Sequence, residues 1–393
     1  MIPTASYEAR GDAPVAWHDR SGAWIGIGTG PAVLMVGAGL ARTTGVTTAA
    51  IGIALGAVTL YLVAVAHGSL GQRHGLAMGA NLQEVLGRGP GPVALTLALV
   101  AAMIGWCGFY LGLGGAALAD LLEAPLWLGS LLLGGVVLGA ALSGQDLWNR
   151  LVYLTAGSSV ALTLITVLTV PVSRQPSDIG VDLQGLATAM GGAIVYAIVF
   201  AMRAPDFTAD LGHARDVWKV GLTMLVPYVA LAGLGIWLYR RTGLHNMADV
   251  LAGTERPEAG QAFLMLSAVG PAITAVYSCA VSIDSIRRTR HIVTMSLVGL
   301  VAIALGAGRF DRNLIGFLEA IAVVIPPALV VVLTVPILKN RPKPSHATLA
   351  WLAGSLVALA VRDAISLAAF LAGAVVAFGW LLVAPRSERP HPT

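Results

Sequence analysis

Gly28-Thr29-Gly30-Pro31 interrupts an apolar run that extends from residue 23 to residue 42. The proline has no amide hydrogen to donate and disfavours helical geometry in the residue before it, so a helix through this run has to break there. A second apolar run, 183–203, carries Gly191 and Gly192 near its middle. Broken helices leave backbone amides and carbonyls free within a bilayer, and matched breaks in two halves of a chain are typical of a transporter's binding site.

The composition indicates a membrane protein. Of 393 residues, 56% are hydrophobic and 11% are charged, with a mean hydropathy of +0.80, whereas roughly a quarter of the residues of a soluble domain are charged. Apolar runs of about 20 residues span a bilayer as helices, and a barrel would show shorter alternating segments instead. The runs that we count are 23–42, 48–67, 93–119, 125–142, 148–170, 183–203, 217–239, 260–283, 292–308, 313–338, 347–361 and 365–384. The sequence therefore predicts an all-α integral membrane protein with 12 transmembrane helices.

Lys and Arg residues predict the orientation. With the N-terminus in the cytoplasm, 16 of the 24 basic residues fall on the inner side and 8 on the outer side, the bias expected of cytoplasmic loops. We expect a multi-pass protein of the cytoplasmic (inner) membrane with both termini in the cytoplasm and no signal peptide. The basic residues form no cluster, so no nucleic-acid partner is expected. Cys107 and Cys279 both lie within spans, so neither a disulfide nor a metal site is expected.

Counting spans predicts an inverted repeat. If spans 1–5 (residues 23–170) and spans 6–10 (residues 183–338) are equivalent units, their odd number of spans forces opposite orientations, and the two interruptions fall at equivalent places. Residues 345–384 then form two peripheral spans, and 1–22 and 385–393 are cytoplasmic segments. The alternative for the glycines is close packing between helices, for which small residues are common in membranes.

Three stretches in order, the last two in spans 3 and 6, resemble the nucleobase:cation symporter-1 family of cytosine, purine, allantoin, hydantoin and hydroxymethylpyrimidine permeases. They are Gly71-Gln72-Arg73-His74-Gly75-Leu76 with Leu86-Gly87-Arg88-Gly89, Gly105-Trp106-Cys107-Gly108-Phe109-Tyr110, and Ala204-Pro205-Asp206-Phe207-Thr208. The resemblance implies the leucine-transporter fold, a five-plus-five inverted repeat with two extra helices. It also implies a substrate site between spans 1, 3, 6 and 8, formed by Gly28, Thr29, Gly30, Pro31, Trp106, Tyr110, Gly192, Tyr196, Thr274 and Ala275.

The aromatic residues suit a flat heterocycle. Trp106 and Tyr110 are one helical turn apart and share a face, and aromatic rings can stack on a planar ligand while polar groups read its edge. Tyr196 falls near the aromatic position of span 6. The alternative is an aromatic packing pair or an interfacial belt, although belts lie at span ends.

Span 8 departs from the family pattern. Gly270 and Pro271 stand near positions where sodium-coupled members carry hydroxyl residues, and Thr274 and Ala275 stand near positions of amide residues. A sodium ion would then depend largely on carbonyls near Gly28 and Ala272, so coupling to Na⁺ or to H⁺ stays open.

Three carboxylates are candidates for coupling or gating. Glu319 lies in an apolar part of span 10, where a carboxylate has to pair, face a cavity or hold a proton, and we hypothesise that it carries a coupling proton rather than a structural hydrogen bond. Asp206 and Asp284 lie near the cytoplasmic ends of spans 6 and 8 and are gating candidates, with a solvated helix end or a pair with Arg203 or Arg287 as the alternative.

The favoured function is import of a nucleobase-like or pyrimidine heterocycle by a symporter-type permease. Spans 1, 2, 6 and 7 would rock against spans 3, 4, 8 and 9 in alternating access, with the bilayer and the solute as partners. No enzyme activity, organic cofactor or obligatory protein partner is expected. The alternatives are an amino-acid or amine transporter of the same fold and, less favoured, an intramembrane enzyme or a sensor.

Overall fold

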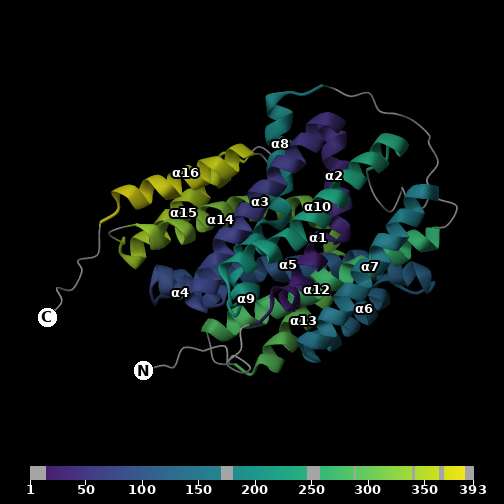
Figure 1. The fold of residues 1–393 in the computed structure, drawn as a ribbon, viewed down its shortest axis with the longest axis horizontal. Coiled ribbons are helices and arrows are strands. Elements are labelled where there is room, and N and C mark those ends of the chain that lie inside the picture. Colours follow the sequence, from purple (N-terminus) through teal and green to yellow (C-terminus); the bar gives the residue numbers. More distant parts are fainter. Residues whose placement is uncertain are drawn as a thin grey trace.

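The computed structural model describes residues 15–169, 180–245, 257–286, 289–338, 341–362 and 367–385. Residues 1–14 and 386–393, which include most of the expected cytoplasmic end segments, lie outside this range, as does Arg287. Within it, nearly all of the regular structure is helical (Figure 1).

Every apolar run of the sequence is helical where it is described. The first run is divided between α1 (Ser21–Gly28) and α2 (Pro31–Thr44). The others correspond to α3 (Val46–His74), α5 (Pro90–Leu121), α6 (Leu126–Leu142), α7 (Gln145–Thr169), α8 (Leu183–Met202), α10 (Ala214–Thr242), α12 (Pro257–Ile286), α13 (His291–Ala307), α14 (Leu314–Thr334), α15 (Pro344–Ala360) and α16 (Leu367–Val383). Short elements join them: η1 (Trp17–Arg20), α4 (Met78–Leu86), α9 (Pro205–Thr208), η2 (Phe310–Asn313) and η3 (Val335–Ile337).

Not every apolar helix is long enough to span a bilayer alone. Within the described residues, six helices are long and apolar enough to cross a bilayer alone, and the bent pair of α1 and α2 raises this to seven. The apolar helices α6, α13 and α16 are shorter. The all-α membrane fold is confirmed, while the count of twelve spans and the inverted repeat stay predictions.

Most close glycine contacts fall within two groups of helices, and the contact of Gly26 on α1 with Gly270 on α12 joins the two groups. In the first, which we call the bundle, Gly37 of α2 lies against Ala232 of α10, and Gly52 of α3 lies against Ala189 of α8. Because no side chain separates them, the backbones of these helices approach closely, as is common between membrane helices. The bundle therefore consists of α1 with α2, α3, α8 and α10, which are the expected spans 1, 2, 6 and 7.

The second group, which we call the scaffold, consists of α5, α6, α12 and α13. Its close contacts pair Gly115 with Ser130, Gly134 with Ile303, Gly306 with Leu111, and Gly114 with Ala268. These four helices are the expected spans 3, 4, 8 and 9. The grouping of spans 1, 2, 6 and 7 against spans 3, 4, 8 and 9 that the sequence predicts is thus present in the packing.

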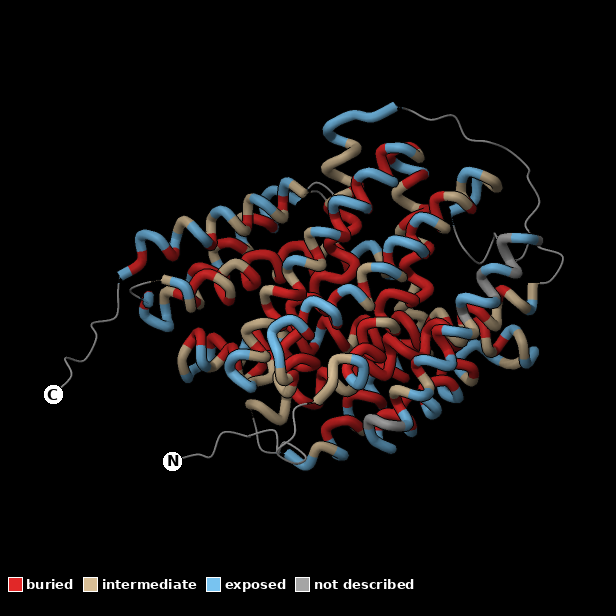
Figure 2. The backbone as a smooth tube through the Cα atoms, in the orientation of Figure 1, coloured by how far each residue is buried: buried red, intermediate tan, exposed pale blue. Residues whose placement is uncertain are grey.

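The surface of the helices is suited to lipid. Figure 2 shows buried residues in the centre of the molecule, on α5, α8 and α12, and exposed residues on the outward faces of the peripheral helices. The exposed faces carry large apolar side chains, among them Val136 on α6, Leu297 on α13, Leu356 on α15 and Val375 on α16. A water-soluble protein rarely exposes so continuous an apolar surface.

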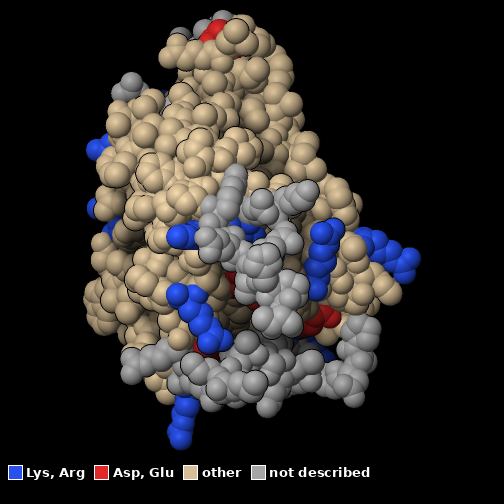
Figure 3. Space-filling view, turned by 90° about the vertical axis from the view of Figure 1, so that its left-hand side faces the viewer, with Lys and Arg blue, Asp and Glu red and all other residues tan. Residues whose placement is uncertain are grey.

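The described chain begins and ends at the same end of the molecule, which we call the inner end. The Arg20 side chain pairs with Asp210, just beyond α9, and the amide of Met78 donates to Asp206 of α9. The amide of Lys343, at the start of α15, donates to the carbonyl of Pro385, beyond α16, at 3.4 Å. In Figure 3, Lys and Arg side chains gather over the lower part of the face that is shown and leave its upper part almost uncharged.

Candidate functional site

The first span is broken as the sequence predicts. The helical segment Trp17–Gly28 and the segment Pro31–Thr44 are bent by 43° relative to each other. Gly30 is extended, with φ −61° and ψ 146°, directly before the proline. The Thr29 hydroxyl donates to the carbonyl of Ile25 at 2.8 Å. A side chain on Gly28 would collide with the carbonyl of Met224 on α10. The glycines therefore serve both the break and a close helix contact.

Three predicted site residues converge on this break. Tyr110 of α5 and Tyr196 of α8 are fully buried, and their hydroxyl oxygens lie 3.0 Å apart. The Tyr196 hydroxyl donates to the carbonyl of Ile27 at 3.1 Å. Because its proton is used there, Tyr110 has to be the donor to Tyr196, and a directed relay runs from Tyr110 through Tyr196 to Ile27. A Cβ on Gly30 would lie 3.1 Å and 3.2 Å from the two hydroxyl oxygens.

Trp106 completes the cluster. Its ring stacks on Tyr110 with centroids 5.6 Å apart and meets the Tyr196 ring edge-on at 5.2 Å. Trp106 is fully buried, and its Nε1 donor finds no acceptor among the described residues. All ring and hydrogen-bond partners of Trp106, Tyr110 and Tyr196 in the described part of the chain are uncharged, so the cluster presents aromatic faces and a few neutral polar atoms.

Four further aromatic residues belong to this cluster and were not predicted as site residues. The ring of Phe109 lies 5.6 Å from Trp106. Phe200 lies 5.9 Å and Phe317 5.4 Å from Trp106, and Tyr228 stacks on Tyr196 at 5.6 Å. Phe200 could have been found, since it follows Tyr196 by one helical turn on the same face. Phe317 occupies the space over Gly105, where a side chain would meet its ring at 2.5 Å. The protein's own rings fill the site in this conformation.

The predicted break in span 6 is wrong. α8 is a continuous helix from Leu183 to Met202, and Gly192 within it packs against Leu40 of α2, where a Cβ would lie 2.9 Å from Leu40 Cδ2. The helix ends instead at Arg203 and Ala204, immediately before Pro205. Gly192 is therefore a close-packing residue, as the alternative interpretation of the glycines had it, and Pro205 marks the end of α8.

The span 8 residues lie in α12 and are buried. The Thr274 hydroxyl donates to the carbonyl of Gly270 at 3.0 Å, and Ala275 lies beside it in the sequence. Gly270 lies against Gly26 of α1, with an added Cβ only 3.0 Å from the Gly26 Cα. One hydroxyl of α12 therefore lies one turn from the α1 contact. Neutral oxygens of this kind suit an alkali cation. The carbonyl of Ala272, another predicted ion ligand, accepts a hydrogen bond from the Cys107 thiol at 3.7 Å.

The gating candidates have specific partners. Asp206 is buried and pairs with Arg203, with Arg203 Nε 2.9 Å from Asp206 Oδ2. The expectation of a solvated end is wrong for Asp206, and the alternative of a pair with Arg203 is confirmed. Asp284 is half-buried and pairs with Nδ1 of His291 at 2.5 Å.

Glu319 is half-buried on α14, between the buried Leu318 and the exposed Ala320. Among the described residues it has no hydrogen-bond or ion-pair partner. Its role as proton carrier stays a prediction.

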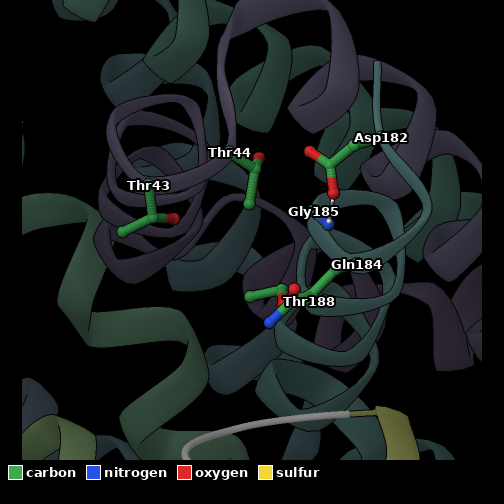
Figure 4. A pocket seen from close by; sticks show the side chains of 6 residues that line it. All are labelled: Thr43, Thr44, Asp182, Gln184, Gly185 and Thr188. Atoms are coloured by element: carbon green, nitrogen blue, oxygen red, sulfur yellow. Dashed lines mark hydrogen bonds between the residues drawn. The ribbon is translucent and has the colours of Figure 1, made fainter. Parts of the chain in front are cut away.

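A polar cavity of about 260 Å³ lies at the opposite end of the molecule from the inner end, between the end of α2 and the start of α8. Figure 4 shows its lining, with Asp182 accepting the Gly185 amide at 2.6 Å. The lining residues are Thr43, Thr44, Asp182, Gln184, Gly185 and Thr188. None of them is a predicted site residue.

A broken first helix, a bundle packed on a scaffold and an aromatic cluster buried at the break together define a membrane fold that is also found in solved transporter structures. The structure is similar to that of Mhp1, a nucleobase-cation-symport-1 family transporter, in a closed conformation with bromovinylhydantoin bound. The TM-score is 0.76 at 13% identity, over 97% of this chain and 95% of that chain. The inward-facing conformation of Mhp1 matches with a TM-score of 0.70 at 13% identity, over 94% of this chain and 92% of that chain.

A Na⁺-coupled sialic acid symporter in a substrate-bound outward-open state is also similar, with a TM-score of 0.71 at 13% identity, over 99% of this chain and 94% of that chain. No protein family profile and no curated protein sequence matches the chain. At this level of identity the likeness shows the fold, and the expected leucine-transporter-like architecture is confirmed.

Proposed function

We propose that this protein is a secondary active transporter that imports a small, flat, uncharged heterocycle of nucleobase or pyrimidine type by alternating access, in symport with Na⁺ or H⁺. One observation carries the proposal: Trp106, Tyr110 and Tyr196 converge on the break of the first span at Gly30. The similar structures include a transporter bound to a hydantoin derivative, which supports a ligand of this shape.

The chemistry of the cluster favours a heteroaromatic ligand with a polar edge. A planar ring that enters between the aromatic side chains gains stacking contacts on its faces. The Nε1 hydrogen of Trp106 has no acceptor among the described residues, and the Tyr110 oxygen, which donates a hydrogen bond to Tyr196, keeps its lone pairs free to accept one. A ligand that carries a carbonyl beside an N–H group would satisfy both atoms.

The absence of charged partners around these rings in the described chain argues against a zwitterion. An amino acid brings a carboxylate and an ammonium group into a buried space, and each needs a compensating partner. The start of α2 could hold a carboxylate, since helix N-termini bind anions, so an amino-acid or amine carrier is the second candidate. An ammonium group would find only the faces of the aromatic rings as partners in the described part of the cluster.

Coupling to an ion is supported by two features. Thr274 and the backbone carbonyls near the contact of Gly26 on α1 with Gly270 on α12 offer neutral oxygens, which would suit Na⁺. Glu319 offers a carboxylate for a proton. A Na⁺-coupled symporter among the similar structures supports an ion in the cycle.

We place the protein in the cytoplasmic membrane with its inner end and both termini in the cytoplasm. The bias of basic residues supports this orientation, and so does the position of the described chain ends at one end of the molecule.

Ligand-dependent thermal stability tests the substrate class. The purified protein is heated with cytosine, uracil, hydroxymethylpyrimidine, hydantoin, leucine or choline, and a ligand at 100 times its Kd is expected to stabilise the folded state by about 2.7 kcal/mol. We expect a shift with at least one heterocycle and none with leucine or choline, and no shift in Trp106→Leu. A shift with leucine or choline alone would support the amino-acid or amine carrier.

A further inference from the structure

Arg203 and Asp206 form a fully buried ion pair at the inner end of the bundle. They lie in the turn that joins α8 to α9, and neither side chain is exposed to solvent. Nε of Arg203 donates to Oδ2 of Asp206 at 2.9 Å, and Nη2 lies 2.8 Å from the same oxygen. Because the two residues are three positions apart in one turn, the pair moves as a unit with α8 and α9.

The pair is bonded to α12 and α4, outside the bundle. The Ser278 hydroxyl donates to Oδ2 of Asp206 at 2.6 Å, and Nη2 of Arg203 donates to the carbonyl of Ser278 and the hydroxyl of Ser282. The Met78 amide, at the start of α4, donates to Oδ1 of Asp206 at 2.8 Å. The network therefore joins the bundle to the scaffold helix α12 at one point.

The residue after Asp206 strengthens this contact. The ring of Phe207 lies 6.1 Å from Trp24, 6.4 Å from Trp148 and 6.1 Å from Tyr277. Trp24 belongs to the bundle, whereas Tyr277 is on α12 and Trp148 on α7. Polar and aromatic contacts thus join the bundle to α12 at the same place.

Separation at this point exposes no single charge. An isolated buried charge is costly, but Arg203 and Asp206 neutralise each other and stay together when α9 moves away from α12. The hydrogen bonds to Ser278, Ser282 and Met78 have to be exchanged for water, and the ring contacts of Phe207 with Trp148 and Tyr277 have to separate. The contact of the ion pair with α12 can therefore hold the two groups of helices together and still be reversible.

The ion pair is also connected to the aromatic site. Tyr196, Phe200 and Arg203 follow each other at spacings of four and three on α8, so they share one helix face. Seven residues of helix span about 10 Å. A ligand that displaces the Tyr196 hydroxyl acts on the helix that ends at Arg203.

We propose that the Arg203–Asp206 pair, which we call the latch, holds the inner end of the protein closed. The pair is hydrogen-bonded to Ser278 and Ser282 of α12 while the inner end is closed, and it separates from α12 as a neutral unit when the inner end opens. This inference rests on the proposed transport function, which supplies the reason for opening.

Hydrogen exchange of the full-length protein in lipid nanodiscs tests the latch without any ligand. The variants are Ser282→Ala and Ser278→Ala, which each remove one hydroxyl from the latch. The matched control is Ser267→Ala, a buried serine of the same helix whose hydroxyl donates only to carbonyls of its own helix.

We expect both latch variants to speed exchange about tenfold at Met78 and at residues 203–209, because hydrogen bonds to charged groups are the stronger ones. Exchange in α5 should not change, and the control should match the natural protein. If both latch variants exchange at the same rates as the natural protein, the proposal is overturned. Faster exchange throughout the protein would also overturn it, because it would mean a general loss of stability. If no heterocycle binds but faster exchange is still confined to Met78 and residues 203–209, the proposed substrate class is wrong and the proposed latch is not.

Discussion

The hydroxyl oxygens of Tyr110 and Tyr196 lie 3.0 Å apart beside Gly30, and the Tyr196 hydroxyl donates a hydrogen bond to the carbonyl of Ile27 at 3.1 Å. Tyr110 belongs to the scaffold, while Tyr196 and Ile27 belong to the bundle. The relay therefore bridges the two groups of helices at the break, as Arg203 and Asp206 bridge them at the inner end. A ligand bound here would contact both groups at once.

Tyr110→Phe should weaken transport without unfolding the protein. The substitution removes the first donor of the relay and leaves the ring stacked on Trp106. A neutral hydrogen bond is worth about 0.5–1.5 kcal/mol, so we expect KM for the transported heterocycle to rise about threefold to tenfold. Tyr228→Phe is the control, because its hydroxyl donates to the carbonyl of Ala193 at 3.0 Å, outside the relay. Equal KM values for the two variants would contradict the role of the relay.

Gly30→Ala should abolish uptake while the fold persists. The backbone of Gly30 suits alanine, with φ −61°, but its Cβ would lie 3.1 Å and 3.2 Å from the Tyr110 and Tyr196 oxygens. We expect uptake to fall at least about tenfold, which corresponds to about 1.4 kcal/mol. Gly39→Ala, in the same helix and with no atom within 4 Å of its added Cβ, should transport normally. Normal uptake by Gly30→Ala would show that the relay does not line the site.

Removing one member of the buried ion pair should cost far more than removing both. Arg203→Leu leaves Asp206 as an uncompensated buried charge, and we expect a loss of about 3–5 kcal/mol in the free energy of unfolding. The double variant Arg203→Leu with Asp206→Leu should recover most of this, because apolar replacements of buried pairs are often neutral. Chemical unfolding in detergent measures both. A double variant as unstable as the single one would show that the charges themselves do not interact.

Glu319→Gln tests proton coupling. The variant keeps the shape of the side chain and cannot exchange a proton, so uptake driven by a proton gradient should fall at least about tenfold, or about 1.4 kcal/mol. Binding of the heterocycle should be retained. Glu84→Gln, on the exposed face of α4, is the control. Proton-driven uptake that survives in Glu319→Gln removes this role.

Much of the fold could be predicted because membrane helices are continuous apolar runs with few alternatives. Pro31 marked the break of the first span correctly, because it follows Gly30, which is extended and precedes the second helix. Proline alone does not mark a break, since Pro227, Pro271, Pro326 and Pro327 lie inside continuous helices. Gly192 did not mark a break, because glycine is equally suited to a close helix contact, here with Leu40. Single glycines therefore could not distinguish a break from packing, whereas Pro205 shows where α8 ends.

The aromatic site was only partly predictable. Trp106 and Tyr110 share one helix face and could be paired from their spacing. Phe317 and Tyr228 come from other helices, and nothing in an apolar helix indicates which of its aromatic residues faces the centre. For Asp206, the sequence offered Arg203 as a partner, but the bonds to Ser278, Ser282 and Met78 depend on how α12 and α4 pack.

The most direct test of the proposed function is uptake into liposomes that contain only the purified protein. Labelled cytosine, uracil, hydroxymethylpyrimidine and hydantoin are supplied outside, under an inward sodium gradient or an inward proton gradient applied separately. We predict that at least one heterocycle accumulates under one of the gradients and that Trp106→Leu abolishes this accumulation. No accumulation of any heterocycle under either gradient, by protein that remains folded, would contradict the proposed function.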